Sequence, residues 1–379
     1  MTVSIVGVGL HPFGRFDISG REMGLIAARD ALADAGLAWS DVHYAAGGSR
    51  DGGHAAALVS ELGLTGVPFI GVYNGCGTGG SALLSAAHAI ESGQAEVALA
   101  VGFDKHARGA FGSNPADYGL PMWYAETGMM VTTQFFALKI QRYLHDHDLE
   151  PRLLAELAAM SLHHGSLTPH AWRRKPVPAG EIADAVMVND PLTSYMFCSP
   201  NEGGAAVVLT SAGKARELRE DPIDVKAVEF RTRRFGTFEV FNPWLAEEIT
   251  DGATVEAAAA AFETAGIGPD EIDVAQLQDT EAGALLMHLA ECGFCEHGEQ
   301  GDWIERGDLT IGGRLPVNTD GGLLANGEPI GASGLRQVIE CVWQLQGRAG
   351  DRQVPDDPRT AFTQVYGAPG ISACTVLAR

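Results

Sequence analysis

The sequence repeats one structural plan in its two halves, and this repeat restricts how the chain folds more than any other feature. Residues 31–37 read ALADAGL and residues 261–267 read AFETAGI. Each ends an apolar helical pattern in a glycine, the residue that commonly terminates a helix in the left-handed conformation. An acidic and an aliphatic residue follow at the same offset, as Asp41-Val42 and as Glu271-Ile272. We therefore predict two duplicated α/β halves.

A second pair of similar segments supports the duplication. Residues 77–81 (GTGGS) and 331–335 (GASGL) each begin an apolar helical pattern. If the halves are equivalent, both helices direct their N-termini toward one central site. Apolar stretches typical of interior strands add to the pattern and predict a layered α/β fold; they are residues 97–101, 205–209, 362–365 and 373–377.

Between the halves, residues 104–201 have a different residue pattern, with clustered aromatic and methionine side chains and two helical stretches at 130–147 and 150–164. Excursions of this length in compact proteins are usually functional. We interpret the segment as an insertion that covers the active site. The predicted organisation is an N-terminal half at 1–103 plus 202–215, the insertion at 104–201, and a C-terminal half at 216–379.

Net charge and cysteine content exclude several classes of function. The formal net charge of -22 disfavours nucleic acid as a partner, because nucleic-acid binding requires a basic face. No apolar run reaches the length of a membrane span. Six thinly spread cysteines and an N-terminus without a basic leader indicate a reducing compartment, so we predict a cytoplasmic protein.

Cys76 stands in a glycine-rich turn, NGCGTGG at 74–80, where the pattern changes from strand to helix. Residues 67–72 predict a short buried strand and residues 81–90 a helix. Glycines let a substrate approach the backbone, and the N-terminal dipole of the helix favours a thiolate. A buried structural cysteine is an equally good interpretation of these residues alone.

Three segments resemble the thiolase superfamily, most closely the sterol-carrier-protein-x type and bacterial proteins labelled lipid-transfer proteins. Residues 74–83 with 98–105 resemble the nucleophile segment, and residues 198–206 (CSPNEGGAA) the segment before the last strand of the N-terminal half. Residues 318–334 (NTDGGLLANGEPIGASG) resemble the most diagnostic signature.

The resemblance implies a five-layered αβαβα fold of two similar halves, commonly a homodimer. It implies coenzyme A thioesters as substrates, with no tightly bound cofactor, and Cys76 as the acyl-accepting nucleophile. Asn318, Gly331 and Ser333 in the signature are predicted to lie on the coenzyme A side of the site. Some relatives work with a small zinc-ribbon/OB-fold companion subunit.

The catalytic positions depart from the thiolase pattern. Where thiolases carry the histidine of a Gly-His-Pro sequence, this chain has Glu328; where sterol-carrier-type thiolases have a His-Asp pair, it has Gln278-Asp279. The stretch similar to the loop that supplies a second cysteine offers Tyr366. A carboxylate needs its pKa raised by burial to replace an imidazole as acid and base.

Three hypotheses follow. The first is acyl transfer with C–C bond cleavage or formation on a coenzyme A thioester, in lipid or sterol catabolism, with Cys76 as nucleophile, Glu328 as acid and base, and Gln278 as a ligand of an oxyanion or water. The second is a retro-aldol reaction on a β-hydroxyacyl-CoA, in which Glu328 or Tyr366 takes the hydroxyl proton. The third is a non-catalytic acyl-CoA or lipid-binding protein, or an inactive subunit.

A zinc site is the weaker interpretation of Cys292 and Cys295, which are flanked by His288 and His297. The spacing suits zinc, but no second CxxC pair accompanies it. We predict two cysteines at the end of a helix and no metal.

Overall fold

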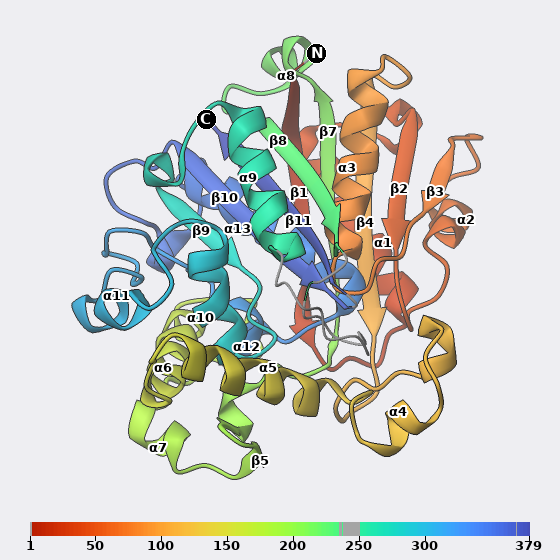
Figure 1. The fold of residues 1–379 in the computed structure, drawn as a ribbon. Helices are drawn as coiled ribbons and strands as arrows, with labels where there is room; N and C mark the ends of the chain where they lie inside the picture. The colour runs from red at the N-terminus through yellow and green to blue at the C-terminus, as the bar shows by residue number, and fades with distance from the viewer. Residues whose placement is uncertain (1, 235–236, 238–250, 369) are drawn as a thin grey trace.

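Nine strands form one mixed sheet with the order β3-β2-β4-β7-β1-β8-β11-β10-β9 in the computed structural model, which describes residues 2–234, 237, 251–368 and 370–379 (Figure 1). The sheet joins the two halves where β1 pairs with β8 in antiparallel register, Val3 opposite Val225 and Ile5 opposite Ile223. The strands of the first half are β1 (Val3–Gly14), β2 (Tyr44–Gly48), β3 (Phe69–Gly71), β4 (Val97–Lys105) and β7 (Glu202–Ser211). Those of the second half are β8 (Ile223–Thr232), β9 (Val274–Leu277), β10 (Thr360–Gly367) and β11 (Ile371–Ala378).

Two helices form the central layer between the half-sheets. These helices, α3 (Thr78–Glu91) and α13 (Ile330–Leu345), pack on each other and on strands of both halves. They approach closely because glycines face each other: a Cβ on Gly79 would lie 2.7 Å from the backbone nitrogen of Leu335. These are the two helices that the repeated glycine segments predicted to be equivalent.

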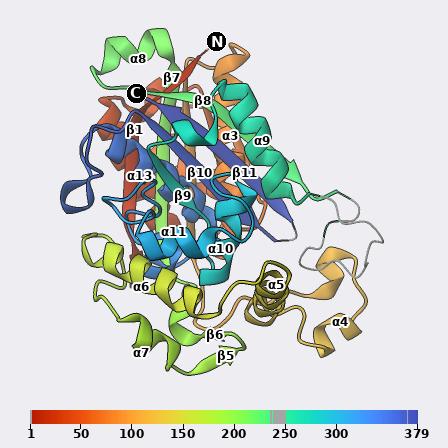
Figure 2. The ribbon, with the colours of Figure 1, turned by 60° about the vertical axis from the view of Figure 1, so that its left-hand side comes forward.

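Outer helices complete the layers. Helix α1 (Gly20–Ala35) covers the first half-sheet (Figure 1). Helix α9 (Ala253–Ala265) covers β8 and β11 of the second (Figures 1 and 2). Both helices end at a left-handed glycine, Gly36 with φ +67° and Gly266 with φ +72°. The predicted thiolase-like five-layered fold is confirmed. The remaining helices outside the insertion are α2 (Val59–Leu62), α8 (Ala212–Leu218), α10 (Ala282–Glu291), α11 (Gln300–Arg306) and α12 (Gly322–Asn326).

The segment between β4 and β7, drawn in yellow and yellow-green, crosses one end of the sheet in both views (Figures 1 and 2). Its helix α6 packs on α10 and α12 of the second half, and its helix α5 packs on α10. Leucines of α6 and α10 belong to one hydrophobic core. The segment is thus part of the main body, although the domain boundaries themselves stay a prediction. It contains α4 (Trp123–Glu126), α5 (Thr132–Asp146), α6 (Arg152–Ser166), α7 (Ala179–Ala183) and the hairpin β5 (Met187–Asn189) with β6 (Leu192–Thr193).

The prediction of a buried strand at 67–72 is wrong. The strand there, β3, has three residues and lies at the edge of the sheet, where Ile70 is 45% exposed. An edge strand has a hydrogen-bonding neighbour on one side only, so apolar composition alone does not bury it.

No helix among the described residues is long and apolar enough to cross a membrane. The predicted C-terminal half, 216–379, and the predicted stretch around Tyr366, 365–370, include positions outside the described residues.

Candidate active site

The turn that carries Cys76 is held by side chains from the first turns of α3. Asn74 donates from Nδ2 to Ser81 Oγ at 2.7 Å, and Thr78 donates from Oγ1 to the Gly75 carbonyl at 2.6 Å. Gly75 has φ +56°, a conformation that favours glycine. The backbone of Gly367, at the end of β10, lies against the same turn, since a Cβ there would be 3.3 Å from the Cys76 nitrogen. The turn therefore places Cys76 between α3 and the second half-sheet.

Glu328 reaches the same place from the segment between α12 and α13. Its backbone nitrogen donates to the Ser199 carbonyl at 2.9 Å, which ties it to the segment before β7. Its carboxyl is fully buried and accepts hydrogen bonds at both oxygens. The donors are Gln278 Nε2, 3.0 Å from Oε1, and Cys198 Sγ, 3.4 Å from Oε2. Cys76 lines the same cavity as Glu328 and interacts electrostatically with this carboxyl.

The contact between Cys76 and Glu328 changes the protonation of both groups. Burial raises the pKa of the Cys76 thiol well above its usual value, and the neighbouring Glu328 carboxylate raises it further. Burial also raises the pKa of Glu328, although hydrogen bonds from Cys76 and Cys198 oppose the rise. The helix dipole was expected to favour a thiolate here, whereas burial and the adjacent carboxylate act in the opposite direction and raise the pKa of the thiol.

Gln278 and Asp279 follow β9 and have different partners. Gln278 is buried and donates from Nε2 to Thr280 Oγ1 at 3.1 Å as well as to Glu328. The carboxyl of Asp279 turns away and accepts from the amide of Leu323, at 2.6 Å, in the first turn of α12. Its burial raises the pKa of Asp279 to about 8. Gln278 therefore belongs to the site, whereas Asp279 holds the helix that precedes Glu328.

Tyr366 lies on β10 and completes a small cavity of about 40 Å³. Cys76, Glu328, Thr280 and Tyr366 line it together with apolar side chains of the insertion, among them Phe136. The Tyr366 ring is 4% exposed and packs in a cluster with Tyr124, Met130, Phe135 and Phe136. The structure thus brings together Cys76, Glu328, Gln278 and Tyr366, and the insertion forms one wall of their cavity.

The predicted coenzyme A ligands do not line this cavity. The Gly331 amide donates to Asp104 Oδ2 at 2.8 Å, and Ser333 donates weakly to the Ile330 carbonyl at 3.4 Å, within α13. Asn318 pairs with the backbone of Leu277, accepting at Oδ1 and donating from Nδ2. All three are fully buried. Their role as coenzyme A ligands stays a prediction.

Asp104 and His106, at the end of β4, hold the start of α13 in place, and the sequence motifs did not identify this role. Asp104 accepts hydrogen bonds from Ser49 Oγ and from the backbone of 50–52, as well as from Gly331. His106 Nε2 accepts from the Ile330 amide at 3.0 Å, so its Nδ1 carries the hydrogen donated to Asp51. The first amides of α13 are therefore engaged within the protein. The available signal was an acidic residue and a histidine directly after a buried strand.

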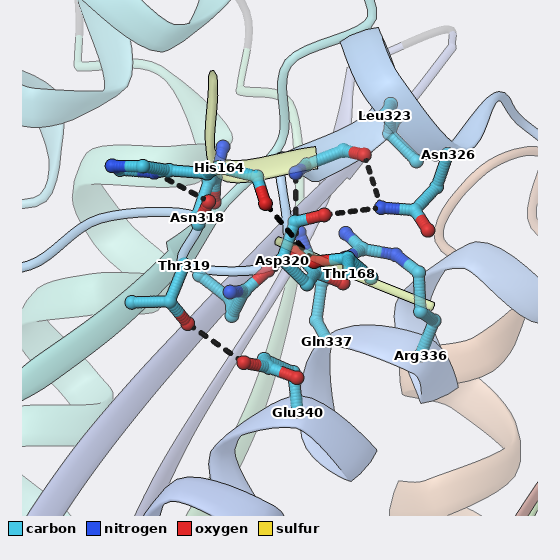
Figure 3. Close-up of polar contacts among 12 residues, drawn as sticks. His164, Thr168, Asn318, Thr319, Asp320, Leu323, Asn326, Arg336, Gln337 and Glu340 are labelled. Carbon is cyan, nitrogen blue, oxygen red and sulfur yellow. Dashed lines mark hydrogen bonds and ion pairs between the residues drawn. The ribbon is translucent and has the colours of Figure 1, made fainter. Parts of the chain in front are cut away.

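A separate buried polar network surrounds Asp320 and Glu340 (Figure 3). With His170 they are the only described residues whose possible ligand atoms cluster closely enough to hold a metal ion. Asp320 is paired with Arg336, and Glu340 with Arg352 at 2.8 Å. Because guanidinium groups already neutralise both carboxylates, this network is an internal ion-pair cluster.

Three of the four residues weighed as zinc ligands have separate partners. His288 Nδ1 lies 2.6 Å from Glu291 Oε2, and His297 Nδ1 lies 2.7 Å from the Tyr143 hydroxyl. Cys292 is buried beside Cys374. Their side chains are thus committed to different neighbours.

Comparisons with known proteins agree with this geometry. The family model "Thiolase, N-terminal domain" matches residues 3–178, and "Thiolase C-terminal domain-like" matches residues 244–379. Sterol carrier protein 2 of Gallus gallus is 32% identical over 99% of this chain and 71% of its own length. An acetyl-CoA acetyltransferase of Methanothermobacter thermautotrophicus is 32% identical over 100% of this chain and 99% of its own. Among solved structures, an Ltp2-ChsH2(DUF35) aldolase superposes with a TM-score of 0.88 at 25% identity, covering 100% of this chain and 98% of that one.

Proposed function

The chain belongs to the thiolase family, and we propose that it is an enzyme that makes or breaks a C–C bond in coenzyme A thioesters at the site formed by Cys76, Glu328, Gln278 and Tyr366. The observation that carries this proposal is the contact of the Glu328 carboxyl with the Cys76 thiol inside a buried cavity. A carboxyl with a raised pKa is a stronger base than an exposed one, and here it lines the same cavity as the Cys76 sulfur.

In the acyl-transfer route, Glu328 takes the proton of Cys76 and the thiolate attacks the β-carbonyl carbon of a β-ketoacyl-CoA. The bond between the α and β carbons breaks, and its electron pair passes to the enolate of the shortened thioester, which takes a proton at the α carbon. The acyl group rests on sulfur until the thiol of a second coenzyme A removes it. Gln278 holds Glu328 in place and orients a water or an oxyanion.

The retro-aldol route is a second candidate, because the raised pKa of Cys76 disfavours a nucleophile and Tyr366 lies in the same cavity. Tyr366 as phenolate takes the β-hydroxyl proton, the carbonyl forms as the α–β bond breaks, and the electron pair passes to the enolate. Protonated Glu328 then delivers a proton to the α carbon. The similar solved structure named as an aldolase supports this route.

Partner and compartment remain part of the proposal. We infer a homodimer in which two copies meet through the edge strand β3, since Ile70 on that strand is 45% exposed and Tyr73, just beyond its end, is 52% exposed. The similar aldolase is named for two components, Ltp2 and ChsH2, and this pairing supports a companion subunit for this chain. A role in lipid or sterol catabolism and a cytoplasmic location complete the proposal.

The test is a panel of β-ketoacyl-CoA and β-hydroxyacyl-CoA esters, with products and intact protein mass measured together. An acyl adduct that forms on the native chain and is absent from Cys76→Ser supports acyl transfer. Cleavage of a β-hydroxyacyl-CoA without any adduct supports the retro-aldol route. Turnover of no ester, with or without a zinc-ribbon/OB-fold companion, contradicts an enzymatic role and leaves acyl-CoA binding. Light scattering on the native chain and on Ile70→Asp tests the dimer.

A further inference from the structure

On the side away from the cavity, Tyr366 lies against a cluster of ionisable side chains that have no role in the proposed reaction. Lys139, on α5, places its Nζ over the phenol ring, 5.0 Å from the ring centroid. His288, on α10, packs against the same ring with the two centroids 5.9 Å apart. The ring is otherwise enclosed by the apolar cluster that includes Phe135 and Phe136. An apolar enclosure alone keeps a phenol protonated, so the position of Lys139 matters.

Further ionisable groups fix the charge state of this cluster. Burial acts to raise the pKa of Glu291, but the hydrogen bond with His288 and the charge of Lys139 outweigh it and lower that pKa to about 2. Glu291 is therefore ionised at neutral pH, and its negative charge lies near Lys139 and His288 beside the ring. Burial raises the pKa of Glu281, at the start of α10, to about 8, so this second carboxyl is largely protonated. On the cavity side, Tyr366 faces Cys76 and Glu328.

We infer that Lys139 is a positioning residue for Tyr366: its ammonium group, held over the phenol ring, stabilises the phenolate and so equips Tyr366 to exchange a proton with the substrate. A cation over an aromatic face interacts more strongly as the ring becomes richer in electrons, which ionisation of the hydroxyl achieves. His288 packs against the same ring, with the two ring planes tilted by 37°, and its Nδ1 lies 2.6 Å from Glu291 Oε2.

The role of Tyr366 in turnover rests on the proposed function, but its ionisation is measurable without a substrate. Phenolate absorbance near 295 nm is titrated in the native chain and in Tyr366→Phe, and the difference isolates the Tyr366 transition. The same subtraction is made in Lys139→Met, in Lys139→Arg, and in Lys214→Met. Lys214 is a matched control because it is a partly exposed lysine paired with Glu217 on the surface of α8.

In Lys139→Met we expect the Tyr366 transition to move up by about 1 pH unit, the usual effect of losing an opposite charge at this range. Lys139→Arg, which keeps the charge, and Lys214→Met are expected to stay within a few tenths of the native midpoint. An unchanged midpoint in Lys139→Met, or an equal shift in Lys139→Arg, overturns the inference. If Lys139→Met does not fold, judged by circular dichroism, Lys139→Gln takes its place.

Activity separates the two proposals. If the midpoint shifts as expected but no ester is cleaved, the proposed function fails while the inference about Lys139 stands. If esters are cleaved and the midpoint does not move, the inference fails alone.

Discussion

Gln278 donates a hydrogen bond from its side-chain amide to the carboxyl of Glu328, with Nε2 3.0 Å from Oε1. These two residues occupy the positions where the resemblance to thiolases leads one to expect imidazoles. They lie 50 residues apart in the chain and differ in chemistry: the amide cannot exchange protons, and the carboxyl can. In the proposed reaction, proton transfer therefore falls to Glu328 and, across the cavity, to Tyr366.

Glu328→Gln is expected to lower turnover by about 10²–10⁴-fold, the usual contribution of a general acid or base. Because the Glu328 carboxylate raises the pKa of Cys76, its removal should also shift the pH of half-maximal Cys76 alkylation by iodoacetamide downward. Peptide mass spectrometry of the Cys76 segment measures this. Glu296→Gln, at an exposed glutamate, is the control, and an upward shift in Glu328→Gln would contradict the contact.

Cys198 is expected to tune Glu328 without touching the substrate. Its thiol donates to Glu328 and lowers that carboxyl's pKa, so Cys198→Ala should move the acidic limb of the kcat/KM profile upward by about 0.5–1 pH unit. Cys198→Ser keeps a donor and should retain the native profile. Equal profiles for Ala and Ser would show that the hydrogen bond is not responsible.

Gly102 is expected to tolerate no side chain. A Cβ there would lie 1.8 Å from the Gly331 carbonyl oxygen, so β4 and the start of α13 would have to separate. We expect Gly102→Ala to lower the free energy of unfolding by about 3 kcal/mol or more, as overpacking and a disrupted buried network do.

Gly36→Ala provides the matched control, because Gly36 has φ +67° with open space around it. The free energy of unfolding of this variant should fall by only about 1 kcal/mol. Urea unfolding of both variants measures the difference. Similar losses in the two would show that the close approach of β4 and α13 is not rigid.

Glu281 predicts a pH dependence of stability. Burial raises its pKa from 4.5 to about 8, so the folded chain holds a proton that the unfolded chain releases. Its contribution to the free energy of unfolding is fully present below about pH 4.5 and is lost as the pH rises toward 8. As the pH rises from 5.5 to 7.5, the free energy of unfolding of Glu281→Gln should increase by up to about 2 kcal/mol relative to that of the native chain. Each pH unit contributes up to ~1.4 kcal/mol for one proton. Urea unfolding of the native chain and of Glu281→Gln at both pH values measures this change. If the difference between their free energies of unfolding is the same at both pH values, the raised pKa is contradicted.

Local patterns were sufficient for most of the fold. Gly36 and Gly266, which lie in the repeated segments 31–37 and 261–267, terminate α1 and α9 in the left-handed conformation, as predicted. The apolar run 205–209 lies in the buried strand β7. The run at 67–72 misled because apolar composition carries no information about whether a strand has a neighbour on both sides.

The resemblance to thiolases supplied the expectation of imidazoles at the positions where Glu328 and Gln278 stand. The sequence by itself determined the two-half architecture and the turn that carries Cys76. These follow from residue type and local spacing, which act within a few residues along the chain. Only the tertiary structure decided that Cys198 donates to the Glu328 carboxyl, that Lys139 lies over Tyr366, and that the surroundings of Cys76 raise the pKa of its thiol. Each of these depends on burial and on charges brought together from distant segments, and a pKa responds to that environment rather than to neighbours in sequence.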